Sequence, residues 1–336
     1  MSLSESENIS LIYLGTRGGG ARLLRDLSIK WNSESRLGSI YVREDCEFSS
    51  ELQGDVHQFK LPRNRLLLLV PSYRRKFANS FIPLLQKGSS NNLLFIMSHP
   101  WNPYLLKRLN KSRIRTIAII HDDRPHLGEI WPTRQHLLKE YKHAKLIVFL
   151  SQHVAKSFNK KIDSLILSLD ALPLVQATAK IQRILVPGRI RKYKGLSKVL
   201  EHLMHVPTDY ELVIAGQGKF KLAETSGRKI NFQNRWLSPN DFETLIMESS
   251  HVLLPYLEAT QSGVISIAKL YNCRVLINDV GGLIEQLENY QNWSLIPKNP
   301  QDISNVLENH VGISNVPTSS KNSIFDLPKI ISGSSR

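Results

Sequence analysis

The sequence predicts two α/β domains, each built around a mostly parallel sheet. Short apolar or β-branched segments alternate with longer stretches of helical periodicity, which is typical of β-α units. The alternation pauses once, across residues 165–181, where a proline and small residues indicate an inter-domain connection. The chain has 336 residues, 41% of them apolar, enough for two cores. We therefore expect domains over residues 1–172 and 173–316, followed by a loosely ordered Ser- and Pro-rich tail, 317–336.

The expected strands place the loops that matter for function. In the first domain we expect strands at 9–14, 39–42, 93–97, 116–120 and 146–150. In the second we expect strands at 183–186, 211–215, 229–232, 251–254 and 274–277, with helices at 196–204 and 239–248. Ligands of open parallel sheets bind beyond the carboxyl ends of the strands. The site is therefore expected in the loops that follow these strands, in a cleft between two facing domains.

The charge of the chain predicts an anionic partner. Lys and Arg number 44 against 29 Asp and Glu, a net charge of +15. Residues 1–170 hold a net charge of +11 and residues 171–336 only +4. No acidic residue occurs at positions 56–121, whereas twelve Lys and Arg do. Nucleic acid, a phosphorylated substrate or a membrane surface would each match such a charge.

The cysteines and the N-terminal segment indicate the compartment. Cys46 and Cys273 are too few for a disulfide framework and have no metal-ligand spacing, which favours a reducing, cytoplasmic compartment. The first ten residues are polar and acidic, unlike a signal peptide, and the longest uninterrupted apolar run covers only residues 66–71. Any membrane contact is therefore expected to be peripheral.

Two strand-end loops of the first domain contain chemically notable residues. Gly18, Gly19 and Gly20 follow the first strand and open a helical stretch, which suits either an anion cradle of backbone N–H groups or a flexible turn. The segment 119–129 runs from a buried strand into His121, Asp122 and three further ionisable side chains of the His or carboxylate type. Their spacing matches no standard metal-ligand set, so no metal is expected. His121 is either a site residue or a structural histidine.

Two loops of the second domain are candidates for binding a diphosphate. Arg189 and Lys194 follow the first strand of this domain and precede a helix, so the turn is either a diphosphate site or a solvated basic turn. The loop 254–264 ends in four residues whose successive backbone N–H groups could bind phosphate oxygens, namely Gln261, Ser262, Gly263 and Val264. The alternative is a simple N-cap by Thr260 or Ser262.

Taken together, residues 183–300 resemble the nucleotide-sugar-binding domain of retaining GT-B glycosyltransferases, the family of sucrose synthases and many bacterial polysaccharide enzymes. Five segments occur in that family's order: the Gly-Arg…Lys-Gly turn at 188–195, YELVIAGQG, NRWLSPNDFETLI, LPYLEATQSG and VLINDVGGLIEQL. In the first half, MSHPWNP and IIHDDRPHLGE resemble the acceptor-side domain of the branch with a PY…QSG loop.

This resemblance implies two Rossmann-like domains and a metal-independent transfer of a hexose, with retention, from a nucleotide-sugar substrate without a further cofactor. It implies that Arg189 and Lys194 neutralise the leaving diphosphate and that Gly18, Gly19 and Gly20 reach the same phosphates. His121 would lie beside the transferred sugar, which completes a catalytic set with Arg189 and Lys194. Four further residues are implied as sugar or nucleoside contacts: Asp122, Gly216, Trp236 and Glu258.

One departure from the family pattern concerns the fourth loop. Many members have two glutamates separated by seven residues, and here Glu258 stands near the first position while Ser266 occupies the second. The branch with QSG lacks the pair as well. A non-catalytic partner subunit that keeps the fold is therefore one alternative to an active transferase.

The remaining alternatives concern the partners of the protein and the class of reaction. The segment 63–87 mixes apolar clusters with Arg74, Arg75 and Lys76, which suits either an anionic membrane surface or a solvated basic face. We expect a glycan or lipid-linked acceptor, as in cell-surface polysaccharide or glycoconjugate synthesis, and a cytoplasmic protein peripheral to the inner face of the membrane. A nucleotide-sugar epimerase is an alternative enzyme of the same architecture, but it should have more carboxylates in the cleft than this sequence offers. The net charge of +15 leaves a basic nucleic-acid-binding protein as another alternative, but nucleic acid is not the expected partner, because aromatic residues are not interleaved with the basic ones.

Overall fold

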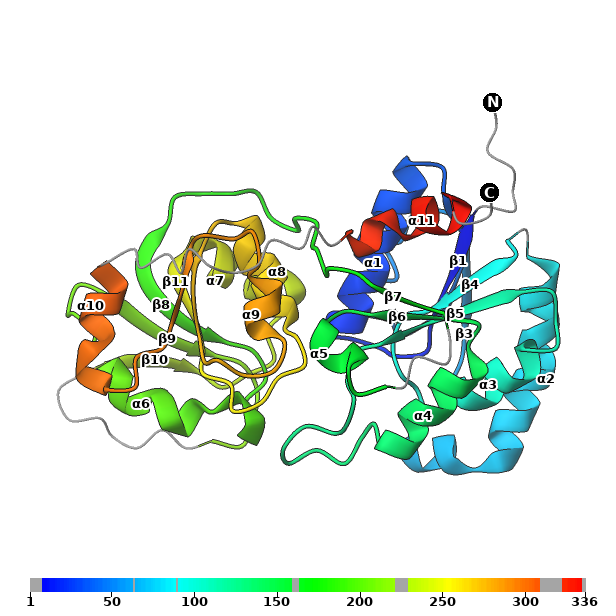
Figure 1. Ribbon diagram of the computed structural model, residues 1–336, viewed down its shortest axis with the longest axis horizontal. Helices are drawn as coiled ribbons and strands as arrows, with labels where there is room; N and C mark the ends of the chain where they lie inside the picture. The colour runs from blue at the N-terminus through cyan, green and yellow to red at the C-terminus, as the bar shows by residue number, and fades with distance from the viewer. Residues whose placement is uncertain are drawn as a thin grey trace. The chain divides into compact units, whose positions relative to one another are not determined.

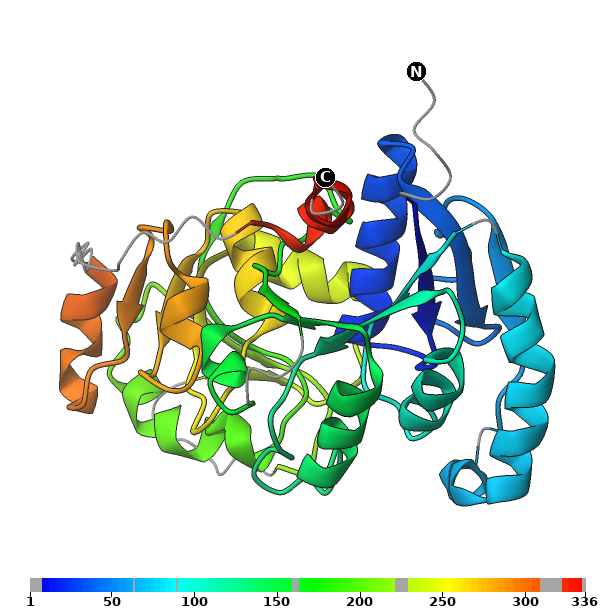
Figure 2. The same ribbon diagram turned by 45° about the vertical axis from the view of Figure 1, so that its right-hand side comes forward.

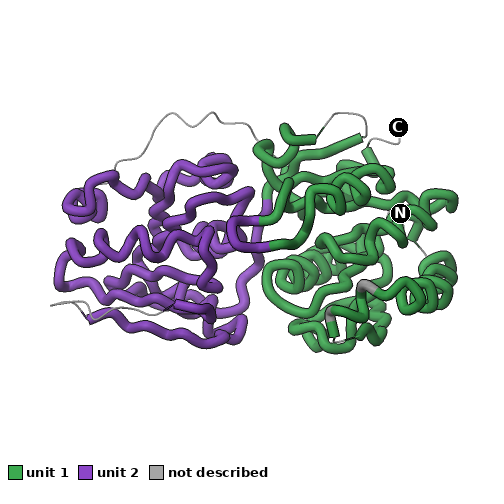
Figure 3. Tube along the Cα trace, turned by 90° about the horizontal axis from the view of Figure 1, so that it is seen from below, with its two compact units in different colours: residues 1–125, 130–168, 321–336 green, residues 126–129, 169–320 purple. Residues whose placement is uncertain are grey.

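A computed structural model of the chain describes residues 8–62, 64–88, 90–158, 163–220, 229–308 and 322–333. The chain forms two compact units (Figure 3). Unit 1 comprises residues 1–125, 130–168 and 321–336, and unit 2 comprises residues 126–129 and 169–320. Each unit contains one parallel sheet with helices on both faces, so the predicted fold class, two Rossmann-like α/β domains, is confirmed.

The sheet of unit 1 has seven parallel strands in the order β3-β2-β1-β4-β5-β6-β7. The strands are β1 (Ile9–Tyr13), β2 (Leu37–Arg43), β3 (Val56–Phe59), β4 (Asn92–Phe95), β5 (Arg115–Ile120), β6 (Leu146–Phe149) and β7 (Ser164–Ile166). The helices are α1 (Gly19–Ser33), α2 (Pro71–Lys87), α3 (Asn102–Leu109), α4 (Arg134–His143), α5 (Gln152–Ala155) and α11 (Leu327–Gly333), with 3-10 turns η2 (Arg65–Leu69) and η5 (Ile324–Asp326).

Both faces of this sheet are covered because its central strands are apolar on both sides. Every residue of β1, β4 and β6 is buried. Phe81 of α2, Leu105 of α3 and Leu137 of α4 belong to the core on one face, while α1 and α11 lie on the other (Figures 1 and 2). A sheet buried in this way reads as continuous apolar runs in the sequence, which is why these strands were predictable.

The sheet of unit 2 has six parallel strands in the order β10-β9-β8-β11-β12-β13. The strands are β8 (Ile181–Pro187), β9 (Glu211–Ala215), β10 (Ile230–Gln233), β11 (Ser249–Leu254), β12 (Arg274–Ile277) and β13 (Trp293–Leu295). The helices are α6 (Leu196–Met204), α7 (Pro239–Glu248), α8 (Gly263–Leu270), α9 (Leu283–Gln286) and α10 (Ile303–Glu308), with 3-10 turns η3 (Lys192–Lys194) and η4 (Pro300–Asp302). Helices α7, α8 and α9 pack on one face, and α6 and α10 on the other.

Three strands, β3, β7 and β13, were not predicted. Each lies at or near an edge of its sheet and has only three or four residues. Because β3 and β7 are no more than half-buried, their residues show no apolar run. The expected strands all occur, and α6 and α7 have the predicted bounds.

The C-terminal segment differs from the loose tail that the sequence predicted. Residues 322–333 form η5 and α11 and belong to unit 1, with Ile324 and Leu327 fully buried. The indole Nε1 of Trp31 donates a hydrogen bond to the carbonyl of Phe325 at 2.8 Å. The apolar residues of this segment recur at helical spacing, and burying them on unit 1 offsets the cost of ordering it. Residues 317–321 and 334–336 of the expected tail lie outside the described residues.

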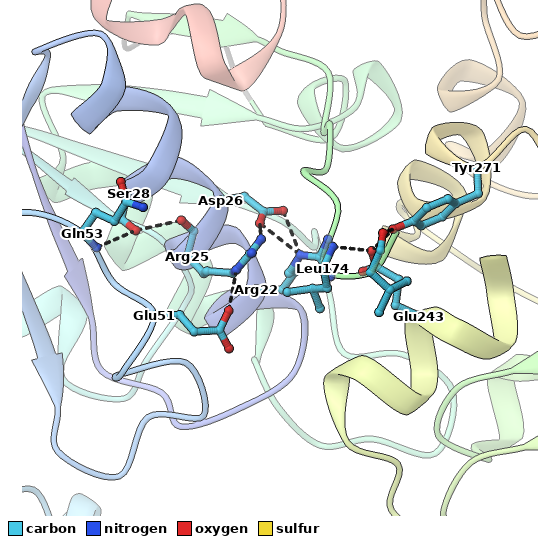
Figure 4. A network of polar contacts seen from close by, with 10 residues as sticks. Arg22, Arg25, Asp26, Ser28, Glu51, Gln53, Leu174, Glu243 and Tyr271 are labelled. Carbon is cyan, nitrogen blue, oxygen red and sulfur yellow. Dashed lines mark hydrogen bonds and ion pairs between the residues drawn. The ribbon is translucent and has the colours of Figure 1, made fainter. Parts of the chain in front are cut away.

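The connecting chain is attached to unit 2 a few residues before the expected domain boundary. Unit 2 resumes at Leu169, whereas the second domain was expected from residue 173. The buried carboxylate of Glu243 on α7 accepts hydrogen bonds from the amide of Leu174, at 2.7 Å, and from the hydroxyl of Tyr271 (Figure 4). Within unit 1, Figure 4 shows a second set of contacts on α1, where Arg25 bonds both Asp26 and Glu51. These contacts fix the helix that follows the glycine loop.

Among the described residues, none of the helices combines the length and the apolar content that crossing a bilayer requires.

Candidate functional site

The strand order of unit 2 locates a candidate ligand site. The chain leaves β8 for β9 on one side, whereas β11 leads to β12 on the other side, so the loops after β8 and β11 diverge. A crevice at such a switch point is the usual ligand site of an open parallel sheet. The two loops, residues 188–195 and 255–262, contain the Arg-Lys turn and the QSG segment that the sequence singled out. The topology therefore places these two motifs on adjacent strand ends.

Two glycines shape the turn after β8. Gly188 has φ +103°, and a Cβ atom on Gly216 would lie 2.1 Å from the Gly188 carbonyl oxygen. Gly216, expected as a sugar or nucleoside contact, thus has a packing role: its missing side chain leaves room for the turn. Arg189, which follows Gly188 in this turn, is exposed to solvent.

A third glycine joins the two loops. Gly195 is left-handed, with φ +67°, and a Cβ atom there would lie 1.9 Å from the carbonyl oxygen of Pro255. The amide of Leu257 also donates to the carbonyl of Tyr193 at 2.7 Å. The backbones of the two loops are therefore in direct contact, and only glycine fits at position 195.

Lys194 ends the turn and points toward the second loop. Its ammonium donates a hydrogen bond to the hydroxyl of Tyr256 and lies 4.0 Å from the centroid of that ring. Burial lowers the pKa of Lys194; Tyr193 and Glu129 counteract this effect, and the nearby charge of Arg189 adds to it. Two cations that repel each other in one turn favour the binding of an anion, which would relieve both the repulsion and the loss of hydration.

The QSG segment supplies hydrogen-bond donors, but not the four successive amides that the sequence predicted. The amide of Ser262 already donates to the Oε1 atom of Gln286 at 2.6 Å. Gly263 and Val264 form the first turn of α8, where amides have no intrahelical acceptor. The Gln261 side chain is buried and accepts a 3.3 Å hydrogen bond from Gln286. Amides 263 and 264 are thus the donors best placed for an anion.

The N-cap alternative for this segment is wrong in one respect. Ser262 is the N-cap residue of α8, yet its hydroxyl makes no capping hydrogen bond to the helix. Instead, its Oγ atom lies 3.2 Å from the hydroxyl oxygen of Tyr256. The hydroxyl therefore faces the same tyrosine as Lys194 does.

The carboxylate of Glu258 is engaged by residues 126–129, which belong to unit 2. The amide of Leu127 donates to Glu258, and the ring of His126 stacks on Tyr193 with centroids 4.5 Å apart. The hydrogen bond from Leu127 thus engages the carboxylate that the sequence assigned to the sugar. Trp236, the candidate for the nucleoside, is half-buried between β10 and α7.

The predicted site residues of unit 1 lie at the carboxyl edge of its own sheet. The switch point there falls between β1 and β4, and Gly18, Gly19 and Gly20 follow β1. The amide of Gly18 already donates to a carboxylate, that of Glu47, at 3.0 Å. The loop thus binds an anionic group in this structure, although the group is internal to the chain. Gly20 has a packing role, since a Cβ atom there would lie 2.5 Å from the Met97 side chain.

His121 and Asp122 follow β5, which lies next to β4. The Nδ1 atom of His121 and a carboxylate oxygen of Asp122 are 3.0 Å apart, so the two side chains form a pair. This contact fixes the orientation of the imidazole. Both residues lie at the strand end where the sequence placed them.

The structure also reveals a polar cluster after β4 that the sequence did not predict. The carboxylate of Glu140 is buried and accepts hydrogen bonds from the hydroxyl of Ser98, at 2.6 Å, and from the ring of His136, at 3.1 Å. Beside them, burial lowers the pKa of His99 to about 3, so that this ring is neutral. The i, i+4 spacing of His136 and Glu140 is the one signal in the sequence, and it resembles an ordinary surface pair.

Comparison with known proteins finds similarity in three-dimensional structure but not in sequence. No protein-family model matches the chain, and no curated protein matches it in sequence. Among solved structures, a sucrose-phosphate synthase from Thermosynechococcus elongatus superposes with a TM-score of 0.65 at 13% identity, covering 89% of this chain and 88% of that one. HepE of Anabaena, crystallised with UDP and glucose, gives 0.64 at 14% identity over 97% and 98%. A putative UDP-N-acetylglucosamine 2-epimerase from Listeria monocytogenes gives 0.67 at 12% identity over 98% and 95%.

The two parallel sheets and this coverage identify the fold as GT-B, as the sequence predicted.

Proposed function

We propose that the protein is a glycosyltransferase that moves a hexose from a nucleotide-sugar donor to an acceptor hydroxyl, with retention and without a metal ion. The observation that supports this most is the pairing of Arg189 and Lys194 with the start of α8 at the β8/β11 switch point. Cations and amide dipoles at such a place suit a diphosphate. The structural similarity to HepE, crystallised with UDP and glucose, also supports a nucleotide-sugar donor.

The chemistry required of the site is the stabilisation of negative charge. As the bond between the anomeric carbon and the diphosphate oxygen breaks, charge accumulates on the diphosphate and the sugar becomes oxocarbenium-like. Lys194 and the amides of Gly263 and Val264 are preorganised to receive that charge, and Arg189 adds a second cation in the same turn as Lys194. The new bond forms between the anomeric carbon and the acceptor oxygen, and the acceptor proton passes to the departing phosphate oxygen on the same face.

The remaining predicted residues have supporting parts in this proposal. The pair of His121 and Asp122 orients the sugar or polarises one of its hydroxyls. Trp236 contacts the nucleoside. The glycine loop of unit 1 would bind a phosphate oxygen through the Gly18 amide in place of Glu47. Glu258 contributes to sugar binding when Leu127 releases its carboxylate.

Product analysis tests this function and separates it from a second candidate. The similarity to an epimerase of the same fold makes UDP-N-acetylglucosamine isomerisation that candidate. With a nucleotide sugar and a panel of glycan acceptors, we expect NMR to show a new glycosidic bond with the donor's anomeric configuration. A 2-epimeric sugar formed without any acceptor would instead establish the epimerase, and an inverted linkage would contradict retention.

We further propose that the protein acts at the cytoplasmic face of a membrane, on a glycan or lipid-linked acceptor of cell-surface polysaccharide or glycoconjugate synthesis. Helix α2 supports this: Arg75, Lys76 and Lys87 are exposed along it, together with Tyr73 (47% exposed) and Leu84 (38% exposed). Helix α3 lies beside it, since Arg108 bonds Asn79 at 2.7 Å, and adds further exposed basic residues. Basic residues beside exposed apolar ones suit the headgroup region of an anionic bilayer.

Co-sedimentation with vesicles checks this surface. Replacing Lys76 and Lys87 together by Gln should weaken binding to vesicles containing phosphatidylglycerol roughly 10-fold or more, because each basic residue near such a surface contributes about 1 kcal/mol. The control pair, exposed Lys198 and Lys229 of unit 2, should leave binding unchanged when replaced by Gln. Equal binding of the native protein to neutral and anionic vesicles would remove the membrane proposal.

A further inference from the structure

Tyr256 lies between the ammonium of Lys194 and the hydroxyl of Ser262, two groups near the proposed diphosphate site. Its side chain is buried, with 2% of the residue exposed. Its hydroxyl accepts a hydrogen bond from the ammonium of Lys194 and lies 3.2 Å from the hydroxyl of Ser262. These two partners come from different loops, those after β8 and β11, so a single hydroxyl connects both sides of the switch point.

The direction of the hydrogen bond between Lys194 and Tyr256 follows from elementary chemistry. A lysine ammonium has three donors and no acceptor, so the Tyr256 oxygen must accept from Lys194. Burial raises the pKa of Tyr256 to about 12, so the phenol keeps its hydrogen near neutral pH. Between the hydroxyls of Tyr256 and Ser262 either oxygen can be the donor, and the phenol hydrogen is available for this contact because Lys194 does not use it. When the phenol donates, Ser262 keeps its own hydrogen to donate at the start of α8.

Rings around Lys194 keep water away but offer it few charged partners. The Tyr193 ring centroid lies 5.7 Å from its ammonium, and that of Tyr256 lies 4.0 Å away. The charged groups that act on Lys194 are Arg189, which disfavours its charged form, and Glu129, which favours it. Loss of the Tyr256 oxygen would leave a poorly hydrated ammonium with one acceptor fewer, and the charged form would become less stable.

We propose that Tyr256 is a positioning residue that holds Lys194 charged and orients the Ser262 hydroxyl toward the diphosphate. This inference rests on the proposed function, because it deepens the assignment of the same site. In this arrangement Lys194 donates to Tyr256 and Tyr256 donates to Ser262, so that both ends of the chain can donate to an anion. Binding of the diphosphate therefore depends on a side chain that does not touch it.

A double-mutant cycle tests the connection, with UDP, GDP, ADP, dTDP and CDP as probes. Tyr256→Phe keeps the ring and should weaken binding of the preferred diphosphate about 10-fold, the usual scale for a hydrogen bond to a charged group. In the Lys194→Met background the same change should alter affinity less than about 2-fold, since the partner it acts through is gone. Tyr290→Phe is the matched control: it removes a remote hydroxyl that donates to the Cys273 carbonyl and should leave affinity unchanged.

The pH dependence of diphosphate binding distinguishes a positioning role of Tyr256 from a purely structural one, because a tyrosine that only packs would not change it. Diphosphate affinity should fall as pH rises through the lowered pKa of Lys194, because the neutral amine no longer attracts the anion. In Tyr256→Phe this fall should occur at lower pH than in the native protein. The NMR titration of the Lys194 ε-methylene, assigned by its absence from Lys194→Met, should shift in the same direction without any ligand.

The outcomes separate this inference from the proposed function. If the native protein binds a diphosphate and Tyr256→Phe binds it equally well with an unchanged pH profile, the positioning role is wrong and the site stands. If no diphosphate binds but the NMR titration shifts as expected, Tyr256 still sets the charge of Lys194 and the nucleotide-sugar assignment fails. Should Tyr256→Phe not fold, Ser262→Ala tests the other end of the chain. We expect it to weaken diphosphate binding about 3-fold or more, and unchanged affinity would overturn the proposal.

Discussion

Replacing Gly195 by alanine is expected to destabilise unit 2 strongly and to abolish diphosphate binding. A left-handed backbone costs a residue with a Cβ atom about 1–2 kcal/mol. The new methyl group would also lie 1.9 Å from the Pro255 carbonyl oxygen, a backbone atom, and such overpacking costs about 1–3 kcal/mol. Because the loops after β8 and β11 meet at this point, their separation would pull Lys194 away from Tyr256. Chemical denaturation, with hydrogen exchange to localise the effect, gives the change in free energy of unfolding.

Gly263→Ala is the matched control for stability. Position 263 is also a glycine of unit 2, but no atom lies within 4 Å of a Cβ built there and its φ angle is not positive. Its free energy of unfolding should change by less than about 1 kcal/mol, and helix propensity favours alanine. If the two alanine variants were equally stable, the close approach of Gly195 to Pro255 would not exist in the protein.

Arg189→Ala is expected to lower turnover by about 100- to 1000-fold, the usual effect of removing one preorganised group that stabilises transition-state charge. Arg189 is exposed, so its loss should leave the fold intact and should affect sugar recognition less than turnover. Steady-state kinetics with the nucleotide sugar measure both quantities. Arg235→Ala is the control, because Arg235 is an exposed arginine of the same unit that pairs with Asp241 at 3.6 Å. Normal turnover in Arg189→Ala would show that this guanidinium does not neutralise the leaving group.

The fold was predictable from the sequence because its buried strands leave a strong pattern. Strands such as β5 and β6 are apolar over most of their length, and polar residues follow their ends. Edge strands such as β3 leave no such pattern, because solvent covers part of them. The C-terminal helix α11 was missed for a different reason: its few apolar residues gain their stability from unit 1, and that partner surface is not visible in the local sequence.

The candidate site was predictable in its residue types and loops but not in its contacts. Arg189 and Lys194 stand out because cations at a strand end before a helix have a simple chemical meaning. Gln286 and Tyr256 were missed, since their roles depend on contacts across 24 and 62 residues. The same contacts show that the amide of Ser262 is already bonded, which spacing alone cannot reveal.

The most direct test of the diphosphate site is calorimetric titration of the full chain, and of Arg189→Ala, with UDP, GDP, ADP, dTDP and CDP. We expect one of these diphosphates to bind the native protein with one site per chain, and to bind Arg189→Ala much more weakly. A ligand that binds the folded protein should also raise its melting temperature, by an amount that grows with the logarithm of the ligand concentration divided by Kd. If none of the five binds the native protein, the assignment of the β8/β11 switch point to a nucleotide-sugar donor is contradicted.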